Sequence, residues 1–395
     1  MAIQEEQFRE YQIEPEHAAR HAAAHMHVNI FTNTPGMTTW RGANLGESTL
    51  IYDLNGRPLF YDFPVLSPQR EQVGTIRASA SRVLGVPAPT TYLGGPRWNT
   101  SRVTLWSQKY VESELRGRVI DSRPVCYAYP KLGIAVDWED PKGEAQRTII
   151  DVGDYSVVPE RVEPQMRGPG AVSVYDSIPE KAVPEATERF ALYDKMVQEL
   201  QERAGLDLAS FLELEEFHKV QTSLVEVIPW YTTKILTFCT HDYSHECFWL
   251  HPQETGYNCV PATGQMILDF WRYYNQQSDV ATAMNTRPTG TGWADEVNGL
   301  ESLTCSHFDA QDDRSPTFDK VRTEIDANRP FDYSYSYHAM ACAGYRQANV
   351  VALGTTPEQS VYIYDPSPVN IGTIRWETWG SGISPVDGFV YLRRP

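Results

Sequence analysis

Basic residues are scarce in this chain, and they are not clustered. The 395 residues include 34 Lys and Arg against 51 Asp and Glu, which gives a formal charge of −17. The deficit is shared almost equally, with −9 before Pro229 and −8 from Pro229 onward. Because recognition of phosphate groups depends on clustered Lys and Arg side chains, we expect no nucleic-acid partner.

Long apolar runs and cysteines are also few. Runs such as Val350–Leu353 are far shorter than the roughly 20 residues that cross a bilayer, so we predict no membrane insertion. The first residues, Met-Ala-Ile-Gln-Glu-Glu, lack the charged and then apolar pattern of a secretory leader. Six cysteines in a chain of this length are too few for a disulfide scaffold. We therefore expect a reducing, cytoplasmic location.

The length allows two or three domains, and the sequence patterns divide the chain into four parts. Residues 1–28 are predicted to contain an N-terminal helix. Residues 29–158 are predicted to form an α+β domain with an antiparallel sheet, because short apolar runs alternate with turns such as Asn55-Gly56. Residues 159–228 are rich in Pro and Gly at first and then helical in pattern, which favours a connector. Residues 229–395 are predicted to be a C-terminal domain.

Two groups of residues in the sequence contain side chains that could bind a metal ion. His17, His21 and His25 recur every fourth residue and would line one face of the N-terminal helix. No neighbouring carboxylate or thiol in the sequence completes a ligand set, so we predict that this face packs or meets solvent.

The second group is the run Cys239-Thr-His-Asp-Tyr-Ser-His-Glu-Cys247. Its ligand types suit zinc, but the single-residue gaps between Cys and His are tighter than usual. The alternatives to a zinc site are a Cys239–Cys247 disulfide, if the protein is in an oxidising compartment, or four side chains without a common partner. We predict no metal and no cofactor for the chain.

The most informative segment surrounds Cys259. Apolar residues form one helical stripe in the segment that follows, namely Met266, Ile267, Phe270, Trp271 and Tyr274. Pro261 suits the first turn, so the helix is predicted to begin near Cys259. The positive end of the helix dipole favours the thiolate, which makes Cys259 a candidate nucleophile. Gln253, six residues upstream, is a candidate donor to an oxyanion beside Cys259, together with the Cys259 backbone N–H.

A thiolate that transfers acyl groups needs an imidazole, and His338 has the most suitable context. It ends the run 331–338, in which large aromatic residues alternate with small or polar ones, so an extended strand would separate His338 from the rings. The next strand predicted ends at Asp365. If Gly344 lies opposite Val361, then Asp365 lies diagonal to His338 and can orient the ring. A shift of one residue would remove this contact.

These residues together resemble the papain-like cysteine peptidases. The resemblance rests on Gln253-x5-Cys259 at a helix start, His338-Ala before Gly344-Tyr345, and Asp365-Pro366, and it covers about residues 230–395. The order is most similar to that in the bacteriocin-processing, double-glycine leader branch. The resemblance implies an α+β, papain-like fold in which Cys259 is the nucleophile, His338 the acid and base, Asp365 the orienting residue and Gln253 the oxyanion donor. A second alignment, on Glu377-Thr-Trp-Gly380, would instead make Glu377 the third residue.

We therefore predict a cysteine peptidase that hydrolyses a peptide or protein substrate through an acyl-enzyme. The segment Tyr52–Phe63, with the strand after it, is similar to sheet modules of peptidase pro-regions and PepSY-type inhibitory domains, which suggests that the N-terminal half covers the cleft. Two alternatives stay open: a papain-fold binding module without turnover, and a thiol acyltransferase or transglutaminase-like enzyme.

Overall fold

The computed structural model describes residues 5–96, 98–160, 165–224, 231–236, 238–239, 242–246, 248–348, 358–380, 383 and 385–395. It is a mixed α+β fold built around one large, mainly antiparallel sheet. The expected fold class is therefore confirmed. No helix in the described ranges combines the length and the apolar character that crossing a membrane requires.

The N-terminal half supplies the helices and strands of one end of the sheet. They are α1 (Glu5–Tyr11), α2 (Pro15–Phe31), β1 (Asn44–Leu45), β2 (Thr49–Tyr52), β3 (Pro58–Leu66), β4 (Gln72–Ser79), β5 (Thr90–Leu93), α3 (Thr100–Ser113), β6 (Arg118–Ala128), β7 (Lys131–Glu139) and β8 (Ala145–Asp151). The hairpin predicted at Asn55-Gly56 joins β2 to β3, and Gly56 adopts φ +82°, a conformation that glycine reaches without steric cost.

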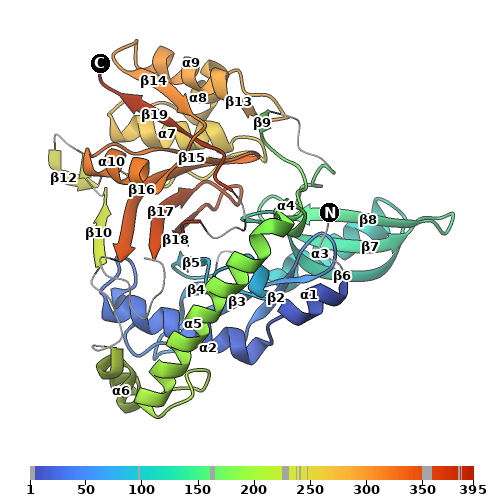
Figure 1. Ribbon diagram of the computed structural model, residues 1–395. Helices are drawn as coiled ribbons and strands as arrows, with labels where there is room; N and C mark the ends of the chain where they lie inside the picture. Colours follow the sequence, from blue (N-terminus) through green and yellow to red (C-terminus); the bar gives the residue numbers. More distant parts are fainter. Residues whose placement is uncertain are drawn as a thin grey trace.

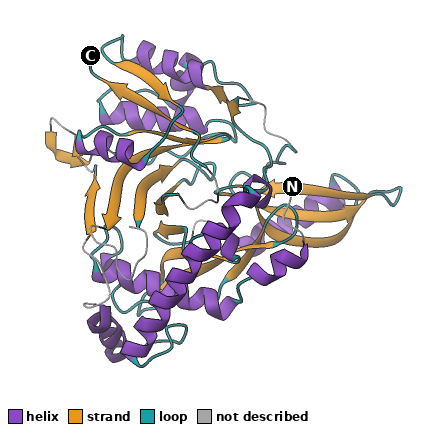
Figure 2. Ribbon diagram, viewed as in Figure 1, coloured by secondary structure: helices purple, strands orange, loops and turns teal. Residues whose placement is uncertain are grey.

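The connecting region runs from the N-terminal sheet across the molecule. It contains β9 (Met166–Arg167), α4 (Val174–Ser177), α5 (Val183–Ala204) and α6 (Leu214–Leu224). Helix α5 buries Phe190, Val197 and Leu200 on one face, as its apolar stripe predicts, and it ends at Gly205 with φ +68°. Helices α2, α5 and α6 pack together at the end of the molecule opposite α7, α8 and α9 (Figures 1 and 2).

The C-terminal half supplies the other end of the sheet and the helices that cover it. Its elements are β10 (Tyr231–Ile235), β11 (Phe238–Cys239), β12 (Asp242–Glu246), α7 (Cys259–Phe270), α8 (Gln277–Ala283), β13 (Thr291–Gly292), α9 (Trp293–Leu303), β14 (Asp309–Asp313), α10 (Phe318–Asp326), β15 (Phe331–Tyr335), β16 (His338–Ala348), β17 (Gln359–Asp365), β18 (Thr373–Thr378) and β19 (Gly388–Arg393).

The two halves share one hydrogen-bonded sheet. Strands follow the order β14-β19-β15-β16-β17-β18-β5-β4-β3-β2-β6-β7-β8, and the junction is the antiparallel pair β18–β5, with Trp376 opposite Thr91 (Figure 1). One hydrophobic core extends from Phe8 to Leu392. The predicted division at residues 159–228 stays a prediction. The hydrogen-bonded ladder of the sheet is continuous between the two segments that this division separates.

The run 331–338 is not one extended strand, so that prediction was wrong. Strand β15 ends at Tyr335 and β16 begins at His338, with Tyr335 paired to His338 across a tight turn. His338 is therefore placed by the reversal of the chain. Nearly all residues of both strands are buried, so the alternation of large and small residues here does not separate a buried face from an exposed one.

Candidate active site

Cys259 is the first residue of α7, as predicted. Asn258 precedes the helix and Pro261 lies in its first turn, where a missing N–H is tolerated. The thiol is completely buried. The helix start therefore aims its positive dipole end at the sulfur, which favours the thiolate.

His338 and Asp365 meet across the paired strands β16 and β17. Nε2 of His338 lies 2.7 Å from Oδ1 of Asp365, and both side chains are buried. The predicted pair Gly344–Val361 was wrong, because a bulge near Ala343 places Gly344 opposite Tyr362. Beyond the bulge the register returns to the expected one, with Ala341 opposite Tyr364, so the predicted contact is preserved.

Asp365 is fixed from two further sides. Arg375, in β18, donates to Oδ2, and the backbone N–H of Ser367 donates to Oδ1 at 2.8 Å. Burial raises the pKa of the Asp365 carboxyl, but the charges of His338 and Arg375 outweigh burial and lower it to about 2. Asp365 is therefore a stable carboxylate beside the ring.

Glu377, the alternative third residue, lies elsewhere in the same polar network. Its carboxylate pairs with Arg375 at 3.0 Å and accepts a hydrogen bond from Tyr335. None of the hydrogen bonds or ion pairs among the described residues joins Glu377 to His338. Glu377 thus acts on the site through Arg375, whereas Asp365 contacts the ring itself.

The thiol and the imidazole influence each other's ionisation. Burial raises the pKa of Cys259, yet the neighbouring His338 outweighs burial and lowers the pKa to about 7. Burial lowers the pKa of His338, but the Asp365 carboxylate more than compensates and raises it. Nδ1 of His338 is buried and makes no hydrogen bond in this structure. The thiol instead donates to the carbonyl of Arg167, at 3.7 Å.

Gln253 is buried near the start of α7, but its side chain is not turned toward the thiol. Nε2 donates to the carbonyl of Thr255 at 2.9 Å, and Oε1 has no partner. The backbone N–H of Gln253 binds the carbonyl of Pro366, which ties this segment to the loop after Asp365. Its expected role as an oxyanion donor stays a prediction.

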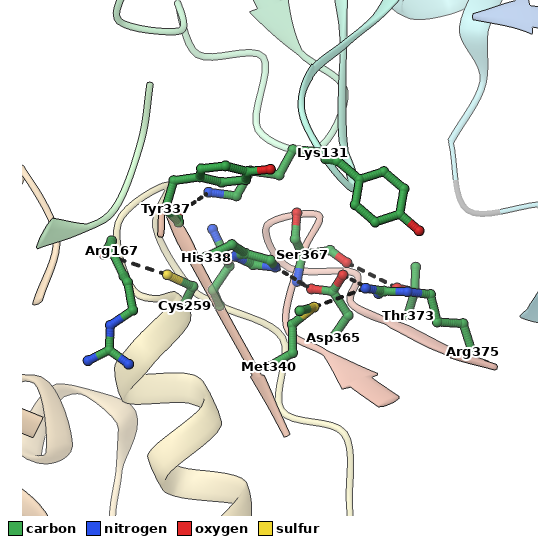
Figure 3. A network of polar contacts seen from close by, with 12 residues as sticks. Lys131, Arg167, Cys259, Tyr337, His338, Met340, Asp365, Ser367, Thr373 and Arg375 are labelled. Atoms are coloured by element: carbon green, nitrogen blue, oxygen red, sulfur yellow. Dashed lines mark hydrogen bonds and ion pairs between the residues drawn. The ribbon is translucent and has the colours of Figure 1, made fainter. Parts of the chain in front are cut away.

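Two residues from outside the C-terminal half complete the site, and sequence reasoning missed both. Lys131, at the start of β7, is buried and donates from Nζ to the carbonyls of Gly168 and Tyr337, at 3.3 and 3.4 Å (Figure 3). Arg167 lies on the other side of Cys259 (Figure 3). Neither residue carries a motif signal. Arg375 carries none either, because Arg375 and Glu377 alternate with Ile374 and Trp376 as in a strand with one exposed face.

Among the described residues, one group could hold a metal ion, and it lies far from this site in the chain. Nε2 of His17 and Nε2 of His21 each lie 2.7 Å from Oδ1 of Asp194, a carboxylate from α5 that the sequence alone did not place there. Arg82 pairs with the other Asp194 oxygen and already balances its charge. His25 contacts Thr91 instead, at 2.9 Å.

The Cys239, His241, His245 and Cys247 side chains lie outside the described residues. The zinc, disulfide and unpaired alternatives for this group therefore stay as the sequence left them.

Two solved structures are similar to part of the chain. One is the peptidase domain of Streptococcus ComA, a bi-functional ABC transporter involved in a quorum sensing pathway, with 14% identity, a TM-score of 0.30, and coverage of 38% of this chain and 99% of that chain. Another is a double glycine motif protease from an AMS/PCAT transporter in complex with the leader peptide, with 11% identity, a TM-score of 0.25, and coverage of 41% and 93%. Among curated proteins, no relative matches.

A comparison with protein families identifies the part of the chain that contains the site. The sequence from 246 to 380 matches the Peptidase_C39 like family, and this interval contains Gln253, Cys259, His338 and Asp365. The helix start and the paired strands that bring these residues together lie within the same interval. Residues 246–380 therefore form a domain of the Peptidase_C39-like family.

Proposed function

We propose that the chain is a cysteine peptidase that hydrolyses peptide bonds through Cys259, His338 and Asp365. The observation that carries the proposal is the buried pair of His338 and Asp365, 2.7 Å apart, with the Cys259 thiol beside the ring at the start of α7 (Figure 3). The C39-like family match supports the same chemistry.

The reaction takes place in two steps. The Cys259 thiolate attacks the carbonyl carbon of the scissile bond, so that a C–S bond forms and the C–N bond breaks, while protonated His338 gives its proton to the departing amine. Neutral His338 then takes a proton from water as the water oxygen attacks the thioester. The C–S bond then breaks, which releases the carboxylic acid and restores the Cys259 thiolate beside protonated His338.

Asp365 and Gln253 have supporting roles in this proposal. Asp365 holds the ring through Nε2 and leaves Nδ1 for the thiol and the leaving group. The backbone N–H of Cys259 and the Gln253 amide would stabilise the oxyanion, provided that Gln253 turns away from Thr255 when substrate binds.

The N-terminal half and the connector cover the site in this proposal. Lys131 and Arg167 both contact the site, and Cys259 and His338 have no exposed surface. Substrate must therefore move residues 166–168 of the connector, the covering segment, before it reaches the thiol.

The test uses the full chain and a peptide mixture, with new termini identified by mass spectrometry. We expect slow cleavage by the wild-type protein, and a loss of about 10²-fold or more in His338→Ala. Cys259→Ala should abolish cleavage, whereas Cys305→Ala, which removes an exposed free cysteine, should leave it unchanged. Cleavage that survives in Cys259→Ala would overturn the proposal. In ¹⁸O-labelled water, hydrolysis places the label in the new carboxylate, and acyl transfer to an added amine does not.

A further inference from the structure

The side chain of Arg167 fills a pocket of the C-terminal half. It is completely buried, although it belongs to the connector. Its guanidinium lies 2.6 Å from Glu296 and 3.6 Å from Asp332, donates to Ser334 at 3.1 Å, and lies 3.9 Å from the ring centre of Trp293. A carboxylate pair and an aromatic face suit the planar cation of arginine.

The backbone of the same residue lies at the nucleophile. The carbonyl of Arg167 is the group to which the Cys259 thiol donates, at 3.7 Å (Figure 3). Strand β9 pairs antiparallel with β13, with Arg167 opposite Thr291 and Met166 opposite Gly292. The two strands form a small sheet of their own, and main-chain pairing with an extended segment is also how many proteins bind peptides. Residues 166–168 therefore occupy the site in the way that a bound peptide would.

The position after Arg167 accepts only glycine. A Cβ atom at Gly168 would lie 2.3 Å from the carbonyl oxygen of Thr289 and 2.8 Å from Cα of Gly290, and both of these are backbone atoms. A Cβ at Gly290 would in turn lie 2.2 Å from the Arg167 carbonyl oxygen. The close approach of residues 166–168 to residues 289–290 therefore requires glycine at the position that follows the Arg167 carbonyl.

The pocket is built to receive a cation. Glu296, from α9, and Asp332, from β15, are fully buried, and burial raises the pKa of both carboxyls. The Arg167 guanidinium is the buried cation that these two carboxyls face. Without a cation, the two buried carboxylates would have neither water nor an ionic partner, and burial of an unpaired charge costs free energy. A neutral side chain of similar shape would leave the two carboxylates without a counter-charge.

We propose that this pocket selects arginine in the polypeptide to be cleaved, and that the scissile bond lies between arginine and a following glycine. Residues 166–168 are an internal stand-in for that substrate and compete with it. The location of the scissile bond rests on the proposed function. The selection of arginine does not, because it concerns only which side chain the pocket binds.

Binding is tested in the full chain with Cys259→Ala to prevent turnover and Gly168→Ala to displace the resident segment. The probes are fluorescein-labelled peptides of the sequence Gln-Met-Arg-Gly-Pro-Gly, taken from residues 165–170, with arginine or with its neutral isostere citrulline. We expect the arginine peptide to bind about 100-fold more tightly. Glu296→Gln should remove most of this preference, and Glu301→Gln, on the same helix α9, should keep it.

Equal binding of the two peptides would overturn the inference. If Gly168→Ala does not fold, Arg167→Ala empties the same pocket and gives the same comparison. Restoring Cys259 separates the two proposals. Selective binding of arginine without cleavage contradicts the proposed function alone, whereas Cys259-dependent cleavage that is indifferent to arginine contradicts the selection of arginine alone.

Discussion

At the scale of the residue, the site depends on which groups contact His338. Asp365 contacts the ring and carries a negative charge that is stable because Arg375 and Ser367 bind its two oxygens. Glu377 is equally buried but contacts Arg375. Substitution of these two acidic residues should therefore have different effects, although the sequence allowed either of them to be the third catalytic residue.

We expect Asp365→Asn to lower kcat/KM for peptide hydrolysis by about 10²-fold or more. The Asp365 charge raises the pKa of His338, so its loss lowers that pKa and moves the alkaline limb of the pH profile toward lower pH. A less protonated ring also stabilises the thiolate less, so the acidic limb, set by the Cys259 pKa of about 7, moves toward higher pH. The active range should narrow from both sides.

Glu377→Gln is the matched control, and most of the activity and the width of the profile should remain. A narrowed profile in Glu377→Gln with a normal one in Asp365→Asn would reverse the assignment. The sequence could predict the helix start at Cys259 and the contact between His338 and Asp365, because a helix start and two consecutive strands leave local signals. It could not predict Lys131 or Arg167, because their contacts join positions far apart in the chain.

At the scale of the element, the strands around His338 were only partly predictable. The sequence indicated the strand ending at Asp365 and the helix beginning at Cys259, since both have local signals. The turn between Tyr335 and His338 and the bulge near Ala343 have no such signal. The alternation in residues 331–338 continues through the turn, and every residue of β15 is buried, so the pattern marks neither the end of the strand nor its register.

Strand β10 gives a prediction about packing next to the bulge. A Cβ atom at Gly344 would lie 2.7 Å from the backbone oxygen of Lys234 and 2.7 Å from the side chain of Ile235. We expect Gly344→Ala to reduce the free energy of unfolding by about 1–3 kcal/mol, measured by urea denaturation. In Gly256→Ala the new Cβ would be 3.7 Å from its nearest neighbour, so that variant should be close to wild type. Equal stability of the two variants would show that β10 does not pack on Gly344 as described.

At the scale of the whole molecule, the two halves are joined by sheet, core and site. The β18–β5 ladder continues the sheet, one core extends through both halves, and Lys131 reaches the site from the N-terminal half. The sequence predicted the α+β class and the order of the segments. It did not predict that the sheet is continuous, because pairing between distant edge strands leaves no local pattern.

This continuity predicts one cooperative unfolding transition. Urea curves followed by tryptophan fluorescence and by far-ultraviolet circular dichroism should coincide, because the large sheet runs through both halves. Two transitions with different midpoints would mean that the halves fold independently.

The most direct test of the central claim is the pH dependence of Cys259 alkylation by iodoacetamide in the full chain. Because the thiolate is the reactive form, the rate should reach half its maximum near pH 7, and His338→Ala should move this midpoint above pH 9, since burial alone raises the pKa. The covering segment lowers the absolute rate in both proteins and leaves the midpoint unchanged. The buried Cys126 and Cys342, each with a pKa raised to about 12, serve as internal references. A midpoint above pH 9 in the wild-type protein, unchanged in His338→Ala, would contradict an activated thiol at Cys259.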